Sequence, residues 1–356
     1  MSRPLLTGAA GALKDGVAVK MRSHRVFVSA MCVGAFAVVL AGVNLRASAA
    51  SSPNGPAPCQ ATHTIGARDS LGALADFYFG DSRYGPAILL ATNARSGHDH
   101  FKFIGDANRL LPGAEVCVPT FAEAERLRLR YETYRRAVAA MVQAEPWEIS
   151  DSLVAIDSAK PVRVVTWIRE DQIAGLKKKA AAGENQTEEA WITQAPSDMW
   201  VTVVPKLKSF CQVYFKDHNG SVEQLTLRLE QRLGLPPGAG KTTFVEIVVK
   251  DPSTATSLFR PCVVPLVSTT SCPLGPPPDN VPISYRNWVF AQYYWSYAVA
   301  QPYSYPWTSL GYTFDWARPE KGNEPFVRFG ESEFVIPKGG ALEIQSVAGT
   351  AKYCSE

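Results

Sequence analysis

The chain of 356 residues is 46% apolar and 19% charged, a composition that supports ordinary buried cores and excludes global disorder. Its length accommodates two or three domains. The formal charge of the whole chain is +3. Residues 1–50 contain six Lys and Arg residues and a single acidic residue, Asp15, so this segment carries +5. The rest of the chain therefore carries −2. A near-neutral remainder gives no indication of a nucleic-acid partner.

Residues 1–50 are predicted to be a signal peptide, with Met21 as an alternative start of the protein. Met21–Arg25 is a short basic start, Val26–Val43 is an apolar run without a charge, and Ala47–Ala49 supplies the small residues of a cleavage site. An uncleaved membrane anchor is the alternative, because an apolar run of this length is borderline for spanning a bilayer. We therefore expect a periplasmic or secreted protein that meets a membrane only if this segment is retained.

The cysteine count agrees with export to an oxidising compartment. Cys32 lies inside the apolar run, and the remaining six cysteines are an even number without a C-x-x-C motif, which favours three disulfides over a redox or zinc site. Fifteen pairings are possible; we predict Cys59–Cys117, because these two bracket a single small unit. The predicted disulfide cysteines are Cys59, Cys117, Cys211, Cys262, Cys272 and Cys354.

After a flexible leader at residues 51–58, residues 59–120 are predicted to form a small module. Asp69 or Ser70 can accept hydrogen bonds from the first N–H groups of a helix that follows. Gly80 suits the left-handed position at the end of that helix.

The ordered motifs of this module resemble the LysM family, whose fold is βααβ and whose members bind N-acetylglucosamine-containing glycans. The resemblance covers residues 62–119 and implies a peptidoglycan or chitin-like oligosaccharide as partner. The matching segments are Thr62–Ile65, Arg68–Ala75, Phe77–Asp81, Ile88–Asn93, Ile104–Gly113 and Val116–Pro119.

The resemblance also implies a shallow glycan groove between the turn after the first strand and the loop before the last strand. One side of the groove would be formed by Arg68, Asp69, Ser70 and Leu71, and the other by Ile104, Gly105, Asp106 and Leu111. The chain departs from the family pattern at Ala67, where a glycine is usual, and in the long stretch 94–103, which could extend or cover the groove. His98-Asp99-His100 lies within that stretch and lacks a third ligand, so neither a metal site nor a cofactor is predicted.

Residues 121–145 are predicted to be a helical linker, because apolar residues recur there at steps of three and four. Residues 150–356 are predicted to form a β-rich α+β domain of no recognised family. Its expected helix is 222–233, and its expected strands are 162–167, 199–204, 243–250, 326–329, 333–336 and 341–347.

Three patterns in this domain leave functional alternatives open. Pro237–Thr242 resembles a nucleotide-binding loop. The motif needs a glycine five residues before Gly240, where this chain has Leu235, and a helix is expected before the loop instead of a strand. We therefore interpret the segment as a turn. The aromatic band between Tyr285 and Trp307 is either a sugar-stacking platform or core packing. A carboxylate pair for glycoside hydrolysis could come from Asp315, Glu324, Glu331 and Glu333.

The sequence thus predicts an α+β protein: a LysM-like module, a linking helix and a disulfide-stabilised β-rich domain. The leading hypothesis is a non-catalytic envelope protein that holds peptidoglycan through the module, while the second domain binds a ligand or another envelope protein. The alternative is a cell-wall glycan hydrolase that the module anchors. A third possibility is that the module serves only as a packing domain.

Overall fold

The computed structural model describes residues 57–96, 99–180, 191–297 and 304–356. The predicted signal peptide and most of the leader lie outside these residues. Within the described residues, no helix is long and apolar enough to cross a bilayer.

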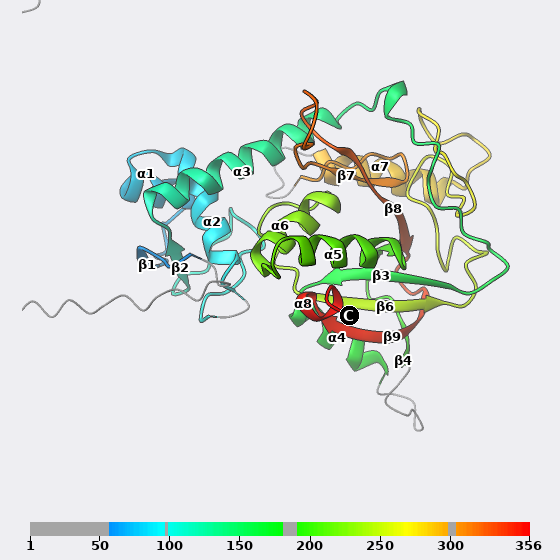
Figure 1. Ribbon diagram of the computed structural model, residues 1–356, viewed down its shortest axis with the longest axis horizontal. Helices are drawn as coiled ribbons and strands as arrows, with labels where there is room; N and C mark the ends of the chain where they lie inside the picture. Colours follow the sequence, from blue (N-terminus) through cyan, green and yellow to red (C-terminus); the bar gives the residue numbers. More distant parts are fainter. Residues whose placement is uncertain (1–56, 97–98, 181–190, 298–303) are drawn as a thin grey trace, which may run out of the picture. The chain divides into compact units, whose positions relative to one another are not determined.

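Residues 59–120 form two antiparallel strands and two α-helices in the order β1, α1, α2, β2 (Figure 1). Ala61 at the start of β1 pairs with Val118, and Thr64 at its end pairs with Glu115. Cys59 is joined to Cys117, which confirms the predicted disulfide. The elements are β1 (Ala61–Thr64), α1 (Leu71–Phe79), the 3-10 turn η1 (Ser82–Tyr84), α2 (Gly85–Asn93) and β2 (Glu115–Val118).

Local signals in the sequence determine where α1 begins and ends. The Ser70 hydroxyl accepts a hydrogen bond from the Ala73 N–H at 3.1 Å, which satisfies one of the free donors of the first turn. Gly80 ends the helix with a φ of 74°, in the left-handed region that only glycine enters without strain. Both expectations from the sequence are confirmed.

The helix α3 (Phe121–Ala140) contributes to two separate apolar cores. Its first half buries Ala124 and Leu127 in a cluster with Leu90 of α2. Its second half buries Tyr134 in another cluster with Trp316. The helix is therefore packed along its length, with Thr120 as N-cap and the 3-10 turn η2 (Pro146–Glu148) following it.

The rest of the chain is built on one seven-stranded sheet in the order β4-β9-β6-β3-β5-β8-β7. Every neighbouring pair of strands is antiparallel. The protein is thus α+β, as the sequence predicts, and it contains a large antiparallel sheet. The strands are β3 (Val162–Ile168), β4 (Trp191–Gln194), β5 (Met199–Val203), β6 (Thr243–Val249), β7 (Tyr312–Asp315), β8 (Arg328–Ile336) and β9 (Ala341–Gly349). The helices are α4 (Glu170–Ala180), α5 (Lys206–Asp217), α6 (Val222–Arg232), α7 (Ile283–Tyr297) and α8 (Thr350–Tyr353).

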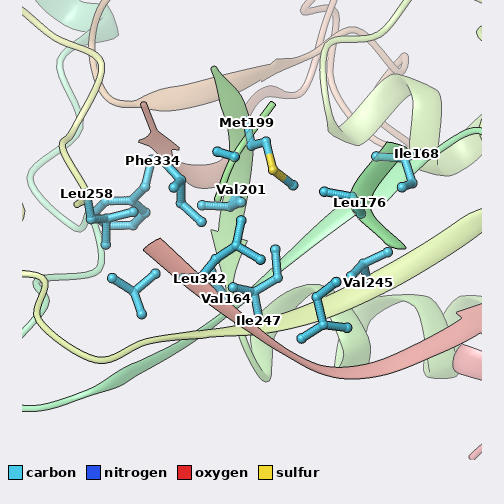
Figure 2. Close-up of a cluster of buried hydrophobic side chains, with 14 of the residues drawn as sticks. Val164, Ile168, Leu176, Met199, Val201, Val245, Ile247, Leu258, Phe334 and Leu342 are labelled. Atoms are coloured by element: carbon cyan, nitrogen blue, oxygen red, sulfur yellow. The ribbon is translucent and has the colours of Figure 1, made fainter. Parts of the chain in front are cut away.

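The sheet is buried on both faces, because alternate residues of its central strands enter two different cores. Val164 and Ile168 of β3 belong to one core, together with Phe334 of β8 and other side chains drawn in Figure 2. Val165 and Trp167 belong to the other core, which α5 and α6 complete. This second face also holds the disulfide Cys211–Cys354, and a third joins Cys262 to Cys272. All six predicted cysteines are therefore paired.

Several elements of this domain, such as α5 and β7, were not anticipated from the sequence, and the structure also differs from the expectations for two segments. Two separate strands were expected around Phe326–Phe329 and Glu333–Ile336, but β8 runs without interruption through Gly330. A Cβ atom at Gly330 would lie 2.3 Å from the Arg232 carbonyl oxygen, so this glycine permits a close backbone approach rather than ending a strand. The aromatic band between Tyr285 and Trp307 was given no helix, yet its first part, up to Tyr297, lies in α7.

Candidate functional site

The two turns named as the sides of a glycan groove are joined where the first turn begins and the second loop ends. Ile65, directly after β1, donates its N–H to the Ala114 carbonyl oxygen and accepts the Gly113 N–H, both at 2.8 Å. These two bonds continue the β1–β2 pairing past the last ladder pair. They hold the start of the first turn against the end of the second loop.

On the first side, the structure divides the four predicted residues between surface and core. Arg68 is exposed and makes no ion pair within the described part of the chain. Ser70 is exposed but its hydroxyl caps α1. Leu71 is buried in the module core, at 6% exposure, so its side chain is a packing group.

Asp69 is held in place by bonds that the sequence analysis did not anticipate. Its Oδ2 atom accepts the Gly66 N–H at 2.7 Å and lies 2.9 Å from Nε2 of His63. The hydrogen bond from Gly66, and then that from His63, lower the pKa of Asp69 below its ordinary value. Nδ1 of His63 lies 3.2 Å from the hydroxyl of Tyr78. A carboxylate, an imidazole and a phenol therefore form one chain that links the turn, β1 and α1.

On the second side of the predicted groove, the loop is held at Ile104 by Asn93. The sequence analysis gave this residue no role. Its buried amide accepts the Ile104 N–H at 2.8 Å and donates to the Ile104 carbonyl oxygen at 3.1 Å. Asp106 accepts the Asn108 N–H at 2.9 Å. Gly105 is exposed, and Leu111 is an apolar side chain with 63% exposure.

The long stretch before Ile104 is described only in part, since residues 97–98, including His98, lie outside the described residues. His100 lies 2.9 Å from a carboxylate oxygen of Glu115 on β2, and Phe101 is buried. The Arg169 guanidinium stacks over the Phe103 ring at 4.5 Å. Among the described residues no group of three or more His, Cys, Asp or Glu side chains could hold a metal ion.

Three of the four carboxylates considered for hydrolysis are engaged in ion pairs. Asp315 is fully buried and accepts two hydrogen bonds from Arg228 at 3.0 and 2.7 Å. Glu331 accepts one from Arg232 at 2.7 Å. These pairs connect α6 to β7 and β8, so we assign Asp315 and Glu331 to structure rather than to acid–base chemistry.

The two remaining carboxylates do not complete a pair. Glu324 is exposed and lies 3.8 Å from Arg328. Glu333 alone makes neither an ion pair nor a side-chain hydrogen bond to any residue that the structure describes, and burial raises its pKa from 4.5 to about 8. It has no free carboxylate partner among these four.

The loop that resembles a nucleotide-binding motif is a turn that connects α6 to β6. The Ala239 N–H points inward and donates to Glu230 at 2.9 Å. This internal carboxylate takes the place that a bound anion would need, in agreement with the interpretation as a turn.

Comparison with known proteins gives no assignment. No family model matches the chain, and neither the curated proteins nor the solved structures include a similar one.

Proposed function

We propose that residues 59–120 are a LysM-type module that binds an N-acetylglucosamine-containing glycan, and that the protein is an exported envelope protein attached to peptidoglycan through it. The observation that supports this proposal is the pair of hydrogen bonds between Ile65 and residues 113–114, which joins the start of the first turn to the end of the second loop. Three disulfides in one chain agree with an oxidising, extracytoplasmic location.

The chemistry of the two turns suits a sugar chain. The exposed side chain of Leu111 offers an apolar contact for a sugar face, while Arg68 and the backbone of Gly105 offer donors for hydroxyl and acetamido oxygens. Asp69 and Asp106 can each accept further hydrogen bonds from a sugar besides the bonds they accept within the protein, because an ionised carboxylate accepts several hydrogen bonds. Of the predicted residues, Leu71 and Ser70 act through the shape of the turn.

The test is sedimentation of the mature protein with insoluble peptidoglycan. We expect the protein to pellet, and Leu111→Ala together with Arg68→Ala to reduce the pelleted fraction strongly. Leu129→Ala is the matched control, because Leu129 is also an exposed leucine, on α3 at 49% exposure. Equal pelleting of both variants would reject the groove.

The same experiment separates the alternative functions. Release of soluble fragments from the pelleted wall would identify the anchored hydrolase. No pelleting by a folded protein would leave the module with a packing role only.

A further inference from the structure

The seven-stranded sheet opens between β3 and β5. β3 pairs with β6 along all seven of its residues, but with β5 only through Val164–Val203 and Val165–Thr202. The other edge of β5 pairs with β8 from Met199 to Thr202, so β5 stays in the sheet while it diverges from β3. A cavity of about 660 Å³ lies at the opening and is lined by residues 165–168 and 199–202 from the two diverging strands. This volume is in the range of small-molecule sites.

Aromatic side chains form much of the wall of this cavity. Trp200 and Trp307 line it, with their ring centroids 6.5 Å apart. Trp295 of α7 and Tyr305 line it as well, yet they are 53% and 41% exposed. These two rings are therefore accessible to a ligand, whereas Trp307, at 6%, is part of the packed wall.

Two buried polar atoms in the same wall have no hydrogen-bond partner among the described residues. They are the Thr202 hydroxyl and the Trp307 indole nitrogen. The strand register places Thr202 opposite both Val165 and Glu333, so the three side chains share one face. Glu333 also lines the cavity, without an ion pair. Because an unpaired buried polar group is destabilising, these groups are suited to a ligand that supplies the missing partners.

The charges around the cavity favour an uncharged ligand. Asp198 accepts hydrogen bonds from the Trp288 indole at 2.7 Å and from the Lys338 N–H at 2.9 Å. Arg169 is paired with Asp171. Lys241 stands near Arg169, and burial lowers its pKa to about 8. Apart from the neighbours Arg169 and Lys241, the described lining residues form no cluster of like charge, and Arg169 already has Asp171 as its counter-ion.

We infer that this cavity binds one N-acetylhexosamine ring of a glycan, stacked on Trp295 or Tyr305 and hydrogen-bonded to Thr202, Trp307 and Glu333. The indole N–H needs an acceptor, which an acetamido carbonyl provides, while sugar hydroxyls can pair with the threonine and the carboxyl. A pyranose ring also has an apolar face that suits an aromatic ring. The choice of an N-acetylated sugar rests on the proposed function of the module.

The module itself borders the cavity. Phe103 and Gly105 are among its lining residues, and Gly105 belongs to the loop proposed to hold the glycan. A second sugar site at this place would let the two regions hold one glycan at two points, which increases the overall affinity without any new contact in the module.

The test is titration of the full, oxidised chain with soluble N-acetylglucosamine tetramer by calorimetry. We expect Trp295→Ala and Thr202→Val each to weaken binding about tenfold, roughly the effect of one lost contact of 1.4 kcal/mol. Trp147→Ala is the matched control, since Trp147 is a comparably exposed tryptophan outside the cavity, at 61%. Trp295→Ala removes one exposed ring, and Thr202→Val replaces a hydroxyl with a methyl group of similar size. Circular dichroism checks that both variants fold.

The result for the cavity can be distinguished from the result for the module. Tetramer binding that Trp295→Ala and Thr202→Val leave unchanged would overturn the cavity site, even if the protein still pellets with peptidoglycan. Conversely, weakened tetramer binding in these variants would support the cavity even if Leu111→Ala pellets like the wild type. A heat signal with tetramethylammonium but none with the tetramer would also overturn it, in favour of a cationic ligand.

Discussion

The module of residues 59–120 and the seven-stranded sheet are stabilised in different ways. The module has two four-residue strands, two nine-residue helices and one disulfide that closes nearly all of it. The sheet has two extensive apolar cores and buried ion pairs that join distant segments. A small unit therefore depends on short-range signals and a covalent closure, whereas the larger unit depends on contacts between residues far apart in the sequence.

The largest effect is expected from the disulfides, and it tests this contrast directly. In the chain-entropy model, a disulfide stabilises more when it closes a longer loop. Cys211–Cys354 has a separation of 143 residues and Cys59–Cys117 one of 58, so removal should cost about 5 and about 4 kcal/mol, respectively. Urea unfolding of the two double-serine variants measures both values. If the module closure proved the more costly of the two, loop entropy would not be the main term.

A smaller effect separates core from surface within the module. Leu71→Ala should cost about 3 kcal/mol, because it leaves a cavity in a packed core, whereas Leu111→Ala should leave stability within about 0.5 kcal/mol. Thermal unfolding measures the difference. Equal costs would show that Leu111 packs in solution and is not available to a glycan.

The pH dependence tests a buried carboxyl of the sheet domain. Burial raises the pKa of Glu230 from 4.5 to about 8, although hydrogen bonds from Ala239 and the nearby Arg130 oppose this shift. Since the folded protein holds this proton more tightly, the stabilisation is complete below pH 4.5 and is lost as the pH rises through about 8. A rise of the pKa from 4.5 to about 8 corresponds to a loss of about 5 kcal/mol over that whole range.

Glu230→Gln keeps the acceptor for Ala239 and removes the titration. Urea unfolding between about pH 5 and pH 9 should therefore show a flatter profile for this variant than for the wild type. Glu333 and Lys241 titrate in both proteins and cancel in the comparison. Parallel profiles would mean that Glu230 is ionised in the folded state throughout.

The smallest effect compares two threonines of the sheet domain. The Thr313 hydroxyl donates to the Arg232 carbonyl oxygen and accepts the Glu331 N–H, at 2.7 and 2.8 Å, so Thr313→Val should cost about 1.5 kcal/mol. Thr202 has no such partners in the part of the chain that the structure describes, and Thr202→Val should be neutral or slightly stabilising. A similar loss in both would show that Thr202 is hydrogen-bonded in the free protein.

What could be predicted from the sequence follows the same division. The cap at Ser70, the glycine at Gly80 and the Cys59–Cys117 bridge depend on neighbours in sequence or on one small unit, and all three are confirmed. The strands β3, β5 and β6 were also predicted, because β-branched runs are local patterns.

The site features that were missed depend on pairings that no local pattern encodes. Asp315 and Glu331 looked like candidates for acid–base chemistry, until α6 supplied Arg228 and Arg232 from 87 and 99 positions away. The cavity lies where β5 diverges from β3, and its lining includes residues of β3, β5, β8 and α7. His63 and Asn93 act through side-chain hydrogen bonds that sequence periodicity does not reveal.

If the module holds peptidoglycan as proposed, the packing of α3 has a mechanical consequence. Because one end of this helix is packed with α2 and the other with Trp316, a force on the module would not be taken up by a flexible linker. The force would be transmitted along the hydrogen-bonded backbone of α3 to the domain that contains the seven-stranded sheet. Separating the module from the sheet domain by force would require breaking the side-chain packing at one end of α3.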